Sequence, residues 1–312
     1  MNSQKPRLII HGGASSLDDK GGLSQVRDCL HEIVNQVYTS LLAGLSAKEA
    51  VVLGCELLEN EPRFNSGTGS VLQSDGQVRM SASLMDGTRG RFSGVINVSW
   101  LKNPIYLANA LQDSDDRVLS DYGAAHLARE LQIPIYDPAT DFRIAEWMEE
   151  RKDNFQSKMA RLYADPEARR GTIGVVALDD QGNIAAGTST GGKGLEKIGR
   201  VSDSATPAGN YANRNAGVSC TGVGEDIIEE CFAAKVVIRK SDGLSLIEAM
   251  QRSMQEALSN NRDLGAIALD NTGTIVWGKT SEILLAAYHN GKEIGDTLEW
   301  VGDAQQLSGF CQ

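Results

Sequence analysis

A glycine–threonine step stands directly before an uninterrupted apolar segment near the middle of this 312-residue chain. The step is Gly171-Thr172, and the apolar run at 172–178 predicts a buried strand. A polar turn at 180–183 and a second apolar run at 184–189 follow, which is the pattern of a β-hairpin. The residues just before Gly171 are charged and poor in core positions, so the organisation of the chain changes at this step.

The order of the expected elements favours an α+β fold. Strand, helices, strands and helices come first, then a connector, then strands, helices and strands. This order predicts a single domain, 1–312, built as a four-layer αββα sandwich of two packed, mainly antiparallel sheets with helices outside. The expected strands lie at 7–10, 78–85, 94–100, 172–178, 184–189, 216–220, 265–269, 274–277 and 283–288, and the expected helices at 23–42, 46–59, 105–112, 119–131, from 225 onward and at 245–258.

Two local features refine this outline. Ser46 precedes a helical pattern and Glu49 follows it by three residues, which predicts an N-terminal capping box. The segment 141–171 is rich in Arg, Lys, Glu and Asp and has few core positions, so it predicts a mobile, partly helical linker.

Composition excludes several classes of partner and compartment. A formal net charge of −11 argues against binding to nucleic-acid backbones or anionic membranes. No apolar run approaches the roughly 18–20 residues that a membrane span needs. The five cysteines form no CxxC pair, and the N-terminal residues run straight into a strand with no signal peptide, so we expect a cytoplasmic protein.

A threonine in the position of Thr172 can be a complete catalyst if it becomes the N-terminus of a chain. Its hydroxyl is then the nucleophile and its own α-amine is the base. A free α-amine has a pKa of about 7.7–8.0, so a useful fraction is neutral near pH 7. Such a mechanism requires no histidine.

Other kinds of catalytic site have little support in the sequence. The run at 187–193 has the spacing of a phosphate-binding loop, but Gly194 stands where the magnesium-binding Ser or Thr belongs. Only His11 among the four histidines lies beside glycines at a strand end, and there is no Gly-x-Ser-x-Gly sequence for a serine triad. No His, Asp and Glu cluster has the spacing of metal ligands.

Two further patterns each allow a structural and a functional interpretation. Arg200 and Asp203 are either a surface ion pair or a clamp for a zwitterion, in which arginine binds a carboxylate and aspartate an ammonium. The run 219–225 is either a plain strand–turn–helix connection or an oxyanion hole made by the Thr221 hydroxyl and the Gly222 N–H.

Taken together, the motifs resemble those of the plant-type (type III) L-asparaginases, which are also isoaspartyl (β-aspartyl) peptidases of the N-terminal-nucleophile (Ntn) hydrolase superfamily. The likeness includes the runs 9–14, 58–71, 82–87 and 171–225, and it is strongest in the last of these. It implies the Ntn-hydrolase fold and the hydrolysis of L-asparagine and of β-aspartyl dipeptides, with no catalytic cofactor.

The resemblance also implies a role for each catalytic residue. Thr172 would be the nucleophile, released by self-cleavage of the Gly171–Thr172 bond. Thr190 would hydrogen-bond the nucleophile, and Thr221 with Gly222 would form the oxyanion hole.

The substrate-binding residues follow from the same resemblance. Arg200 would bind the α-carboxylate of the substrate and Asp203 its α-ammonium, with Gly224 lining that pocket. Asn65 would support the nucleophile.

A structural sodium ion and a defined assembly are implied as well. Self-cleavage would give subunits of 171 and 141 residues that stay associated, and two such pairs would form an (αβ)2 dimer. The sodium ion would be bound by backbone carbonyls of Leu58, Glu59, Glu61, Phe64, Ser66 and Thr68.

Several positions depart from the family pattern: Ser15, Ser81, Ser202 and Val223. None of them is the nucleophile, and Ser202 puts a side chain in the substrate pocket. Three alternatives stay open. One is a glycosylasparaginase, although the secretory signal and disulfides usual for that enzyme are not apparent. Another is a non-catalytic relative, an uncleaved binding or storage protein, and the third is a nucleotide-binding protein.

Overall fold

The apolar segment after Thr172 forms strand β5, Ile173–Leu178, which pairs antiparallel with β6, Ile184–Thr190. The computed structural model describes residues 5–14, 21–152, 154, 171–302 and 306–312. In it the β5–β6 hairpin is central to an eight-stranded sheet with the order β12-β11-β1-β5-β6-β2-β3-β4. Strand pairs in this sheet are antiparallel except for β3 and β4. Its other strands are β1 Arg7–His11, β2 Met80–Asp86, β3 Arg91–Val98, β4 Val118–Ser120, β11 Ala286–His289 and β12 Ile294–Asp296.

A second sheet of five antiparallel strands packs against the first in the order β13-β10-β9-β8-β7. Strands β5 and β6 contact β8, and β1 contacts β9, so the two sheets lie face to face. The strands of this sheet are β7 Asn210–Ala212, β8 Ala216–Gly222, β9 Leu264–Asp270, β10 Ile275–Lys279 and β13 Ser308–Cys311.

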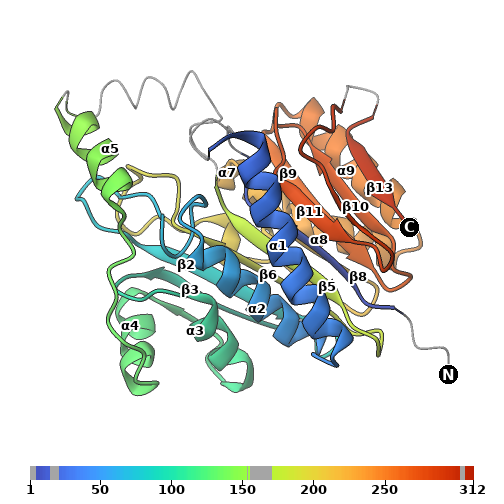
Figure 1. Cartoon of the computed structure of the whole chain (residues 1–312), viewed down its shortest axis with the longest axis horizontal. Coiled ribbons are helices and arrows are strands. Elements are labelled where there is room, and N and C mark those ends of the chain that lie inside the picture. The colour runs from blue at the N-terminus through green and yellow to red at the C-terminus, as the bar shows by residue number, and fades with distance from the viewer. Residues whose placement is uncertain (1–4, 15–20, 153, 155–170, 303–305) are drawn as a thin grey trace.

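Helices cover the outer face of each sheet (Figure 1). Helices α1 and α2 lie on the larger sheet, and α8 and α9 lie on the smaller one, which gives four layers. The α-helices are α1 Gly22–Leu42, α2 Ala47–Asn60, α3 Ile105–Ala110, α4 Asp121–Glu130, α5 Asp141–Arg151, α7 Gly224–Glu230, α8 Phe232–Ser241 and α9 Leu246–Ser259, and short 3-10 helices occupy Leu111–Asp113 and Asp203–Ala205.

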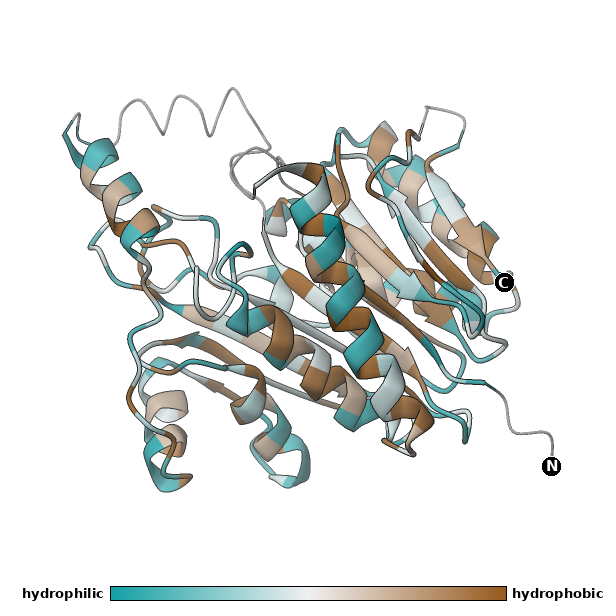
Figure 2. Cartoon of the chain, viewed as in Figure 1, coloured by the Kyte–Doolittle hydropathy of each residue, from teal (hydrophilic) through white to brown (hydrophobic). Residues whose placement is uncertain are grey.

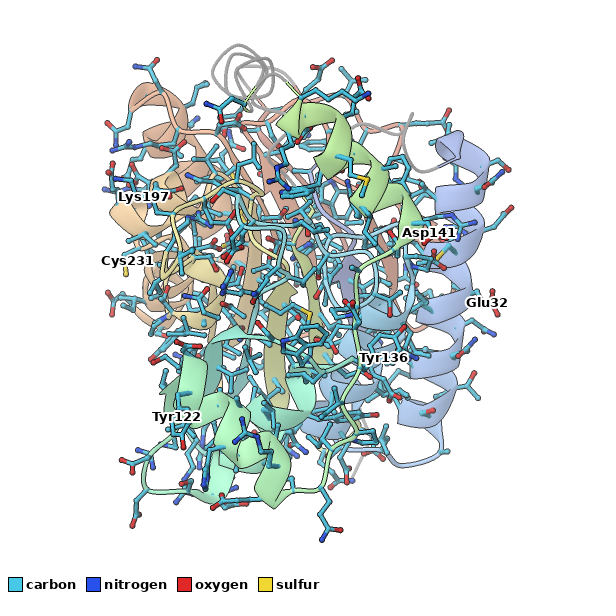
Figure 3. The ribbon with its side chains drawn as sticks, turned by 90° about the vertical axis from the view of Figure 1, so that its left-hand side faces the viewer. Glu32, Tyr122, Tyr136, Asp141, Lys197 and Cys231 are labelled. Atoms are coloured by element: carbon cyan, nitrogen blue, oxygen red, sulfur yellow. The ribbon has the colours of Figure 1, made fainter. Side chains whose placement is uncertain are left out.

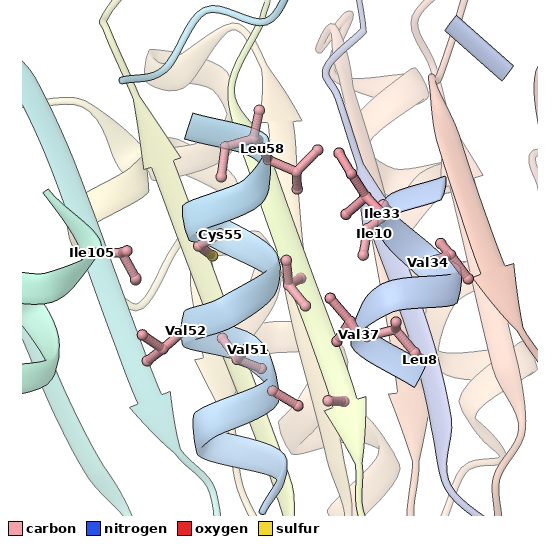
Figure 4. Packing of buried hydrophobic residues seen from close by; sticks show 14 of the residues in the cluster. Leu8, Ile10, Ile33, Val34, Val37, Val51, Val52, Cys55, Leu58 and Ile105 are labelled. Carbon is pink, nitrogen blue, oxygen red and sulfur yellow. The ribbon is translucent and has the colours of Figure 1, made fainter. Parts of the chain in front are cut away.

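Strand β5 is buried on both faces, and its side chains alternate between two cores. Val175 and Ala177 belong to the core beneath α1 and α2, whereas Val176 and Leu178 belong to the core between the sheets. Figure 4 shows α2 contributing side chains such as Val51 to the first of these cores. In Figure 2 the strands of the two sheets carry many brown, apolar segments, whereas brown and teal segments alternate along α1.

The surface is polar where the helices face outward. Figure 3 shows Glu32 and Asp141 projecting from the outer sides of α1 and α5, and both residues are exposed. None of the helices in the described ranges is both long and apolar enough to cross a membrane. All five cysteines lie within the described ranges, and each is a free thiol.

The predicted architecture is confirmed, and so is the capping box. Ser46 accepts a hydrogen bond from the Glu49 N–H, and the Glu49 carboxylate accepts one from the Ser46 N–H. The strand predicted at 283–288 begins later, at Ala286. The start of the helix predicted at 119–131 was wrong, because 118–120 form β4, the parallel edge strand. Helix α8 and the short strands β7, β12 and β13 were not predicted.

The predicted linker 141–171 is only partly within the described ranges. Helix α5 lies inside it and stands apart from the sheets at one end of the molecule (Figure 1). Residues 153 and 155–170 of the prediction lie outside the described residues.

Candidate active site

Thr172 lies immediately before β5 and is almost fully buried, with 8% of its surface exposed. The pairing of Ile173 with Ser189 sets it beside the last residue of β6, Thr190. The Thr172 hydroxyl donates a hydrogen bond of 3.1 Å to Thr190 Oγ1, which also accepts one from the Gly192 N–H. The predicted nucleophile and its predicted partner are therefore in direct contact.

The peptide bond before Thr172 is held by close backbone packing. The Asn65 N–H donates to the Gly171 carbonyl at 3.2 Å, and a Cβ at 171 would overlap the Cβ of Asn65. Gly13 has φ +111°, and a Cβ there would lie 2.8 Å from Gly171 Cα. The Asn65 side chain donates to the Gly192 carbonyl at 2.6 Å and accepts from the Val71 N–H. Only glycine fits at 171, and its carbonyl already has a donor.

The predicted oxyanion hole is at the end of β8. Gly222 has φ +129°, and a Cβ there would lie 2.6 Å from Leu264 Cα, so both backbone conformation and space require glycine. Thr221 is fully buried, and its hydroxyl has no hydrogen-bond partner among the described residues. Gly222 lines the cavity that contains Thr172, and Thr221 precedes it on the strand.

Arg200 is held by an ion pair, and its partner is Glu225 rather than Asp203. Its Nε and Nη2 donate to the two Glu225 carboxylate oxygens at 2.8 and 2.9 Å, and Lys193 Nζ donates to the same carboxylate at 3.1 Å. A Cβ at Gly224 would lie 2.7 Å from Arg200 Nη2 and 2.9 Å from Asp203 Oδ1. Because residue 224 has no side chain, the Arg200 guanidinium and the Asp203 carboxylate can both lie against its backbone.

The two carboxylates of this group have opposite pKa shifts. Burial raises the pKa of Asp203 to about 7, although the nearby Arg200 charge opposes the shift. Burial also disfavours the charge on Glu225, but the hydrogen bonds and positive charge of Arg200, together with a backbone hydrogen bond and the charge of Lys193, outweigh it and lower the pKa to about 2. Near pH 7 the Glu225 carboxylate is therefore ionised, whereas the Asp203 carboxylate is only partly ionised.

Most of the residues predicted for catalysis and substrate binding line one cavity, whereas the predicted sodium ligands do not. Asn65, Gly171 and Thr221 are not among the residues that line it. Ser202 lies in the cavity, as its position between Arg200 and Asp203 led us to expect. Lys193 and Glu225 were not predicted as site residues, although they belong to the 187–193 and 219–225 motifs, which could have indicated them. The cavity is lined by Thr172, Thr190, Gly192, Lys193, Arg200, Ser202, Asp203, Gly222, Val223, Gly224 and Glu225.

His11 lies between the two sheets and not in the cavity. Its Nε2 is 3.0 Å from Ser219 Oγ, which is 2.6 Å from Thr188 Oγ1, and Gly174 leaves the space for this contact. Burial lowers the pKa of His11 to about 3, although a hydrogen bond with the Thr172 backbone opposes the shift. The ring is therefore neutral, and it does not contact the Thr172 hydroxyl as the base of a serine-type triad would.

The loop predicted to bind sodium is compact, and hydrogen bonds connect it to β6. The Thr68 N–H donates to the Glu59 carbonyl at 2.8 Å, and a Cβ at Gly67 would overlap the same oxygen. The Glu59 side chain is fully buried, which raises its pKa to about 8, and it accepts a hydrogen bond of 2.6 Å from Ser189 Oγ. Ser66 Oγ is 2.7 Å from the same Ser189 oxygen. The loop thus contacts β6 one residue before Thr190.

The chain is similar to known proteins over most of its length. A family model described as asparaginase matches residues 4–299. An isoaspartyl peptidase/L-asparaginase of Synechocystis sp. is 74% identical over 298 residues, which are 94% of this chain and 91% of that protein. Another isoaspartyl peptidase/L-asparaginase, from Nostoc sp., is 66% identical over 96% of both chains. A plant-type L-asparaginase of Pyrococcus furiosus is 35% identical over 90% of this chain and 95% of its own. Each similarity spans nearly the whole of both proteins.

The raised pKa of Asp203 predicts a pH-dependent cost to stability. The folded protein holds this proton more tightly than the unfolded chain, whose carboxyl has its ordinary pKa of 3.8. Stability is therefore lost as the pH rises from about 4 to about 7. Relative to the wild type, Asp203→Asn should gain stability over this range and keep a constant advantage above pH 7, as measured by urea midpoints from pH 4 to 9. Asp115→Asn, at an exposed carboxylate, is the matched control. A difference that does not change with pH would contradict the assignment.

Proposed function

The chain belongs to the asparaginase family, and on that premise we propose that it is an amidohydrolase activated by self-cleavage. We propose that it hydrolyses L-asparagine to L-aspartate and ammonia and also cleaves dipeptides that begin with an isoaspartyl residue. The observation that carries this proposal is the shared cavity. Thr172, Arg200 and Asp203 line this one cavity together.

The first reaction is the maturation of the chain. The Thr172 Oγ attacks the carbonyl carbon of Gly171, the peptide C–N bond breaks, and an ester forms on the hydroxyl. Water then hydrolyses the ester, which leaves a carboxylate on Gly171 and a free amine on Thr172. The N–H of Asn65 supports this step because it donates to the carbonyl oxygen on which negative charge develops.

The second reaction uses the released amine. The Thr172 Oγ attacks the side-chain carbonyl of the substrate, and its α-amine accepts the hydroxyl proton and returns it to the departing amine. The Gly222 N–H and the Thr221 hydroxyl stabilise the oxyanion, and the unpartnered state of that hydroxyl leaves it available. Thr190 keeps the nucleophile oriented through its hydrogen bond. Water then hydrolyses the β-aspartyl ester to release L-aspartate.

Recognition of the substrate depends on its zwitterionic end. Arg200 binds the α-carboxylate, Asp203 binds the α-ammonium, and Gly224 keeps the two groups close enough to serve one α-carbon. A glycosylasparagine substrate would need room beyond the amide nitrogen, and an assay with glycosylasparagine distinguishes that alternative. An intact chain that binds aspartate without turnover would identify a non-catalytic relative.

We further propose that backbone oxygens of the 58–68 loop bind a structural sodium ion. A carbonyl has two lone pairs, so oxygens such as that of Glu59 can accept a backbone N–H and still bind a hard cation. A Cβ at Gly69 would overlap the Pro62 carbonyl oxygen and lie 2.9 Å from that of Phe64, so these two carbonyls point toward the same part of the loop. Among the described residues no cluster of three His, Cys, Asp or Glu side chains offers another metal site. The free thiols suit a reducing compartment, and we propose the cytoplasm, which cell fractionation would test.

Self-cleavage gives the first prediction for this function. The intact mass of purified wild-type protein, after a timed incubation, should resolve into fragments of 171 and 141 residues, the smaller beginning at Thr172. Thr172→Ala removes the attacking oxygen and should stay whole. Native mass of the cleaved protein should correspond to two such pairs, the proposed (αβ)2 dimer. A wild-type chain that remains whole under all conditions would refute the mechanism.

Arg200→Ala tests the binding of the substrate carboxylate. Loss of a charge-assisted bond should raise KM for L-asparagine by about 10- to 100-fold, and self-cleavage should continue because Arg200 does not contact Gly171. Steady-state kinetics and intact mass measure the two effects. Arg214→Ala, at an exposed arginine outside the cavity, is the control and should leave KM unchanged. An unchanged KM in Arg200→Ala would contradict the assignment.

Sodium binding should appear as added stability. At matched ionic strength, the thermal midpoint should be higher in sodium chloride than in choline chloride, because an ion that binds only the folded loop stabilises it. The difference should follow a saturation curve in sodium concentration. Identical thermal midpoints in sodium chloride and choline chloride would contradict the proposed sodium site.

A further inference from the structure

Ser202 carries a buried hydroxyl that the fold does not use. The residue is 5% exposed, and Ser202 Oγ has no hydrogen-bond partner among the described residues. It lines the same cavity as Thr172, Arg200 and Asp203. A buried, unpaired hydroxyl costs free energy, and in a native structure it indicates a missing partner such as a ligand.

Local backbone structure does not account for this hydroxyl. Ser202 is the N-cap residue of the short 3-10 helix Asp203–Ala205, a position where serine usually accepts a hydrogen bond from a backbone N–H. Here its side chain makes no such bond. The hydroxyl is therefore free to donate to a molecule in the cavity.

The ion pair of Arg200 limits how a ligand carboxylate can bind in the cavity. Glu225 occupies Nε and Nη2 of the guanidinium, which is the edge that most readily binds a carboxylate with two parallel bonds. Nη1 makes no hydrogen bond within the part of the chain that the structure describes, which leaves it for a ligand. A carboxylate that binds there has a second oxygen, which requires another donor in the cavity. Lys193 is already engaged with Glu225, whereas Ser202 is buried and unpaired.

We propose that Ser202 is a substrate-binding residue whose Oγ–H donates to one oxygen of the ligand α-carboxylate while Arg200 donates to the other. The assignment rests on the proposed function for the identity of the ligand. The proposed role of Ser202 requires that the ligand has a free carboxylate, which binds between residues 200 and 203. Glu225 is then a positioning residue, because it fixes which edge of Arg200 faces the cavity.

Calorimetric titration of the purified protein with L-aspartate and with succinate tests the proposal. Succinate lacks the ammonium group but keeps both carboxylates. Ser202→Ala removes one hydrogen bond to a charged group and should weaken the binding of both ligands by about tenfold. Ser202→Gly removes the same hydroxyl and provides a second variant if the first folds poorly. KM for L-asparagine should rise in parallel, with kcat changed less than about twofold because the reacting atoms are untouched.

The chain contains a matched control two residues away. Ser204 is also fully buried, with a hydroxyl that has no partner among the described residues, but it does not line the cavity. Ser204→Ala should leave both affinities unchanged. Unchanged affinities in the Ser202 variants would overturn the proposal, and so would a loss confined to L-aspartate, because it would assign the hydroxyl to the ammonium. A wild-type protein that binds both ligands without turnover would refute only the proposed function.

Discussion

The register of the β5–β6 hairpin is the constraint on which the site depends. Strand β5 is buried on both faces, so a slip of one residue would exchange Val175 with Val176 and expose each core to the wrong side chains. The same register sets Thr172 beside Thr190. Packing of two separate cores therefore fixes the contact between the two hydroxyls on which the proposed mechanism depends.

Close backbone packing is a second constraint on the geometry of the site. Gly13, Asn65 and Gly171 come from three distant segments, and side-chain-free positions let their backbones touch. The Asn65 side chain also donates to the Gly192 carbonyl, in the loop that follows β6. A single asparagine thus connects the Gly171–Thr172 peptide to the loop after Thr190.

Charge at the site is arranged in a chain rather than in isolated pairs. Lys193, Glu225, Arg200 and Asp203 follow one another through the cavity wall, two cations alternating with two anions. Buried charges cost less when they are paired, and here the pairing also orients the guanidinium. Asp203, the least compensated of the four, has the raised pKa. Its charge is best stabilised by an ammonium group, which is what the proposed substrate supplies.

The sequence by itself determined the fold class and the position of Thr172 before its strand, because these depend on periodicity, and the resemblance of its motifs to a known family indicated six residues of the cavity: Thr172, Thr190, Arg200, Asp203, Gly222 and Gly224. The tertiary structure decided the partner of Arg200. Arginine at 200 and aspartate at 203 are close in sequence, yet the ion pair forms with Glu225, which the β8–α7 connection brings from 25 residues away. It likewise decided that the hydroxyl of Ser202 is buried and unpaired and that His11 binds Ser219 between the sheets. The short edge strands β7 and β12 were not predicted either, because each has too few residues to show a periodic pattern. Pairing with a neighbouring strand, which only the tertiary structure provides, stabilises them.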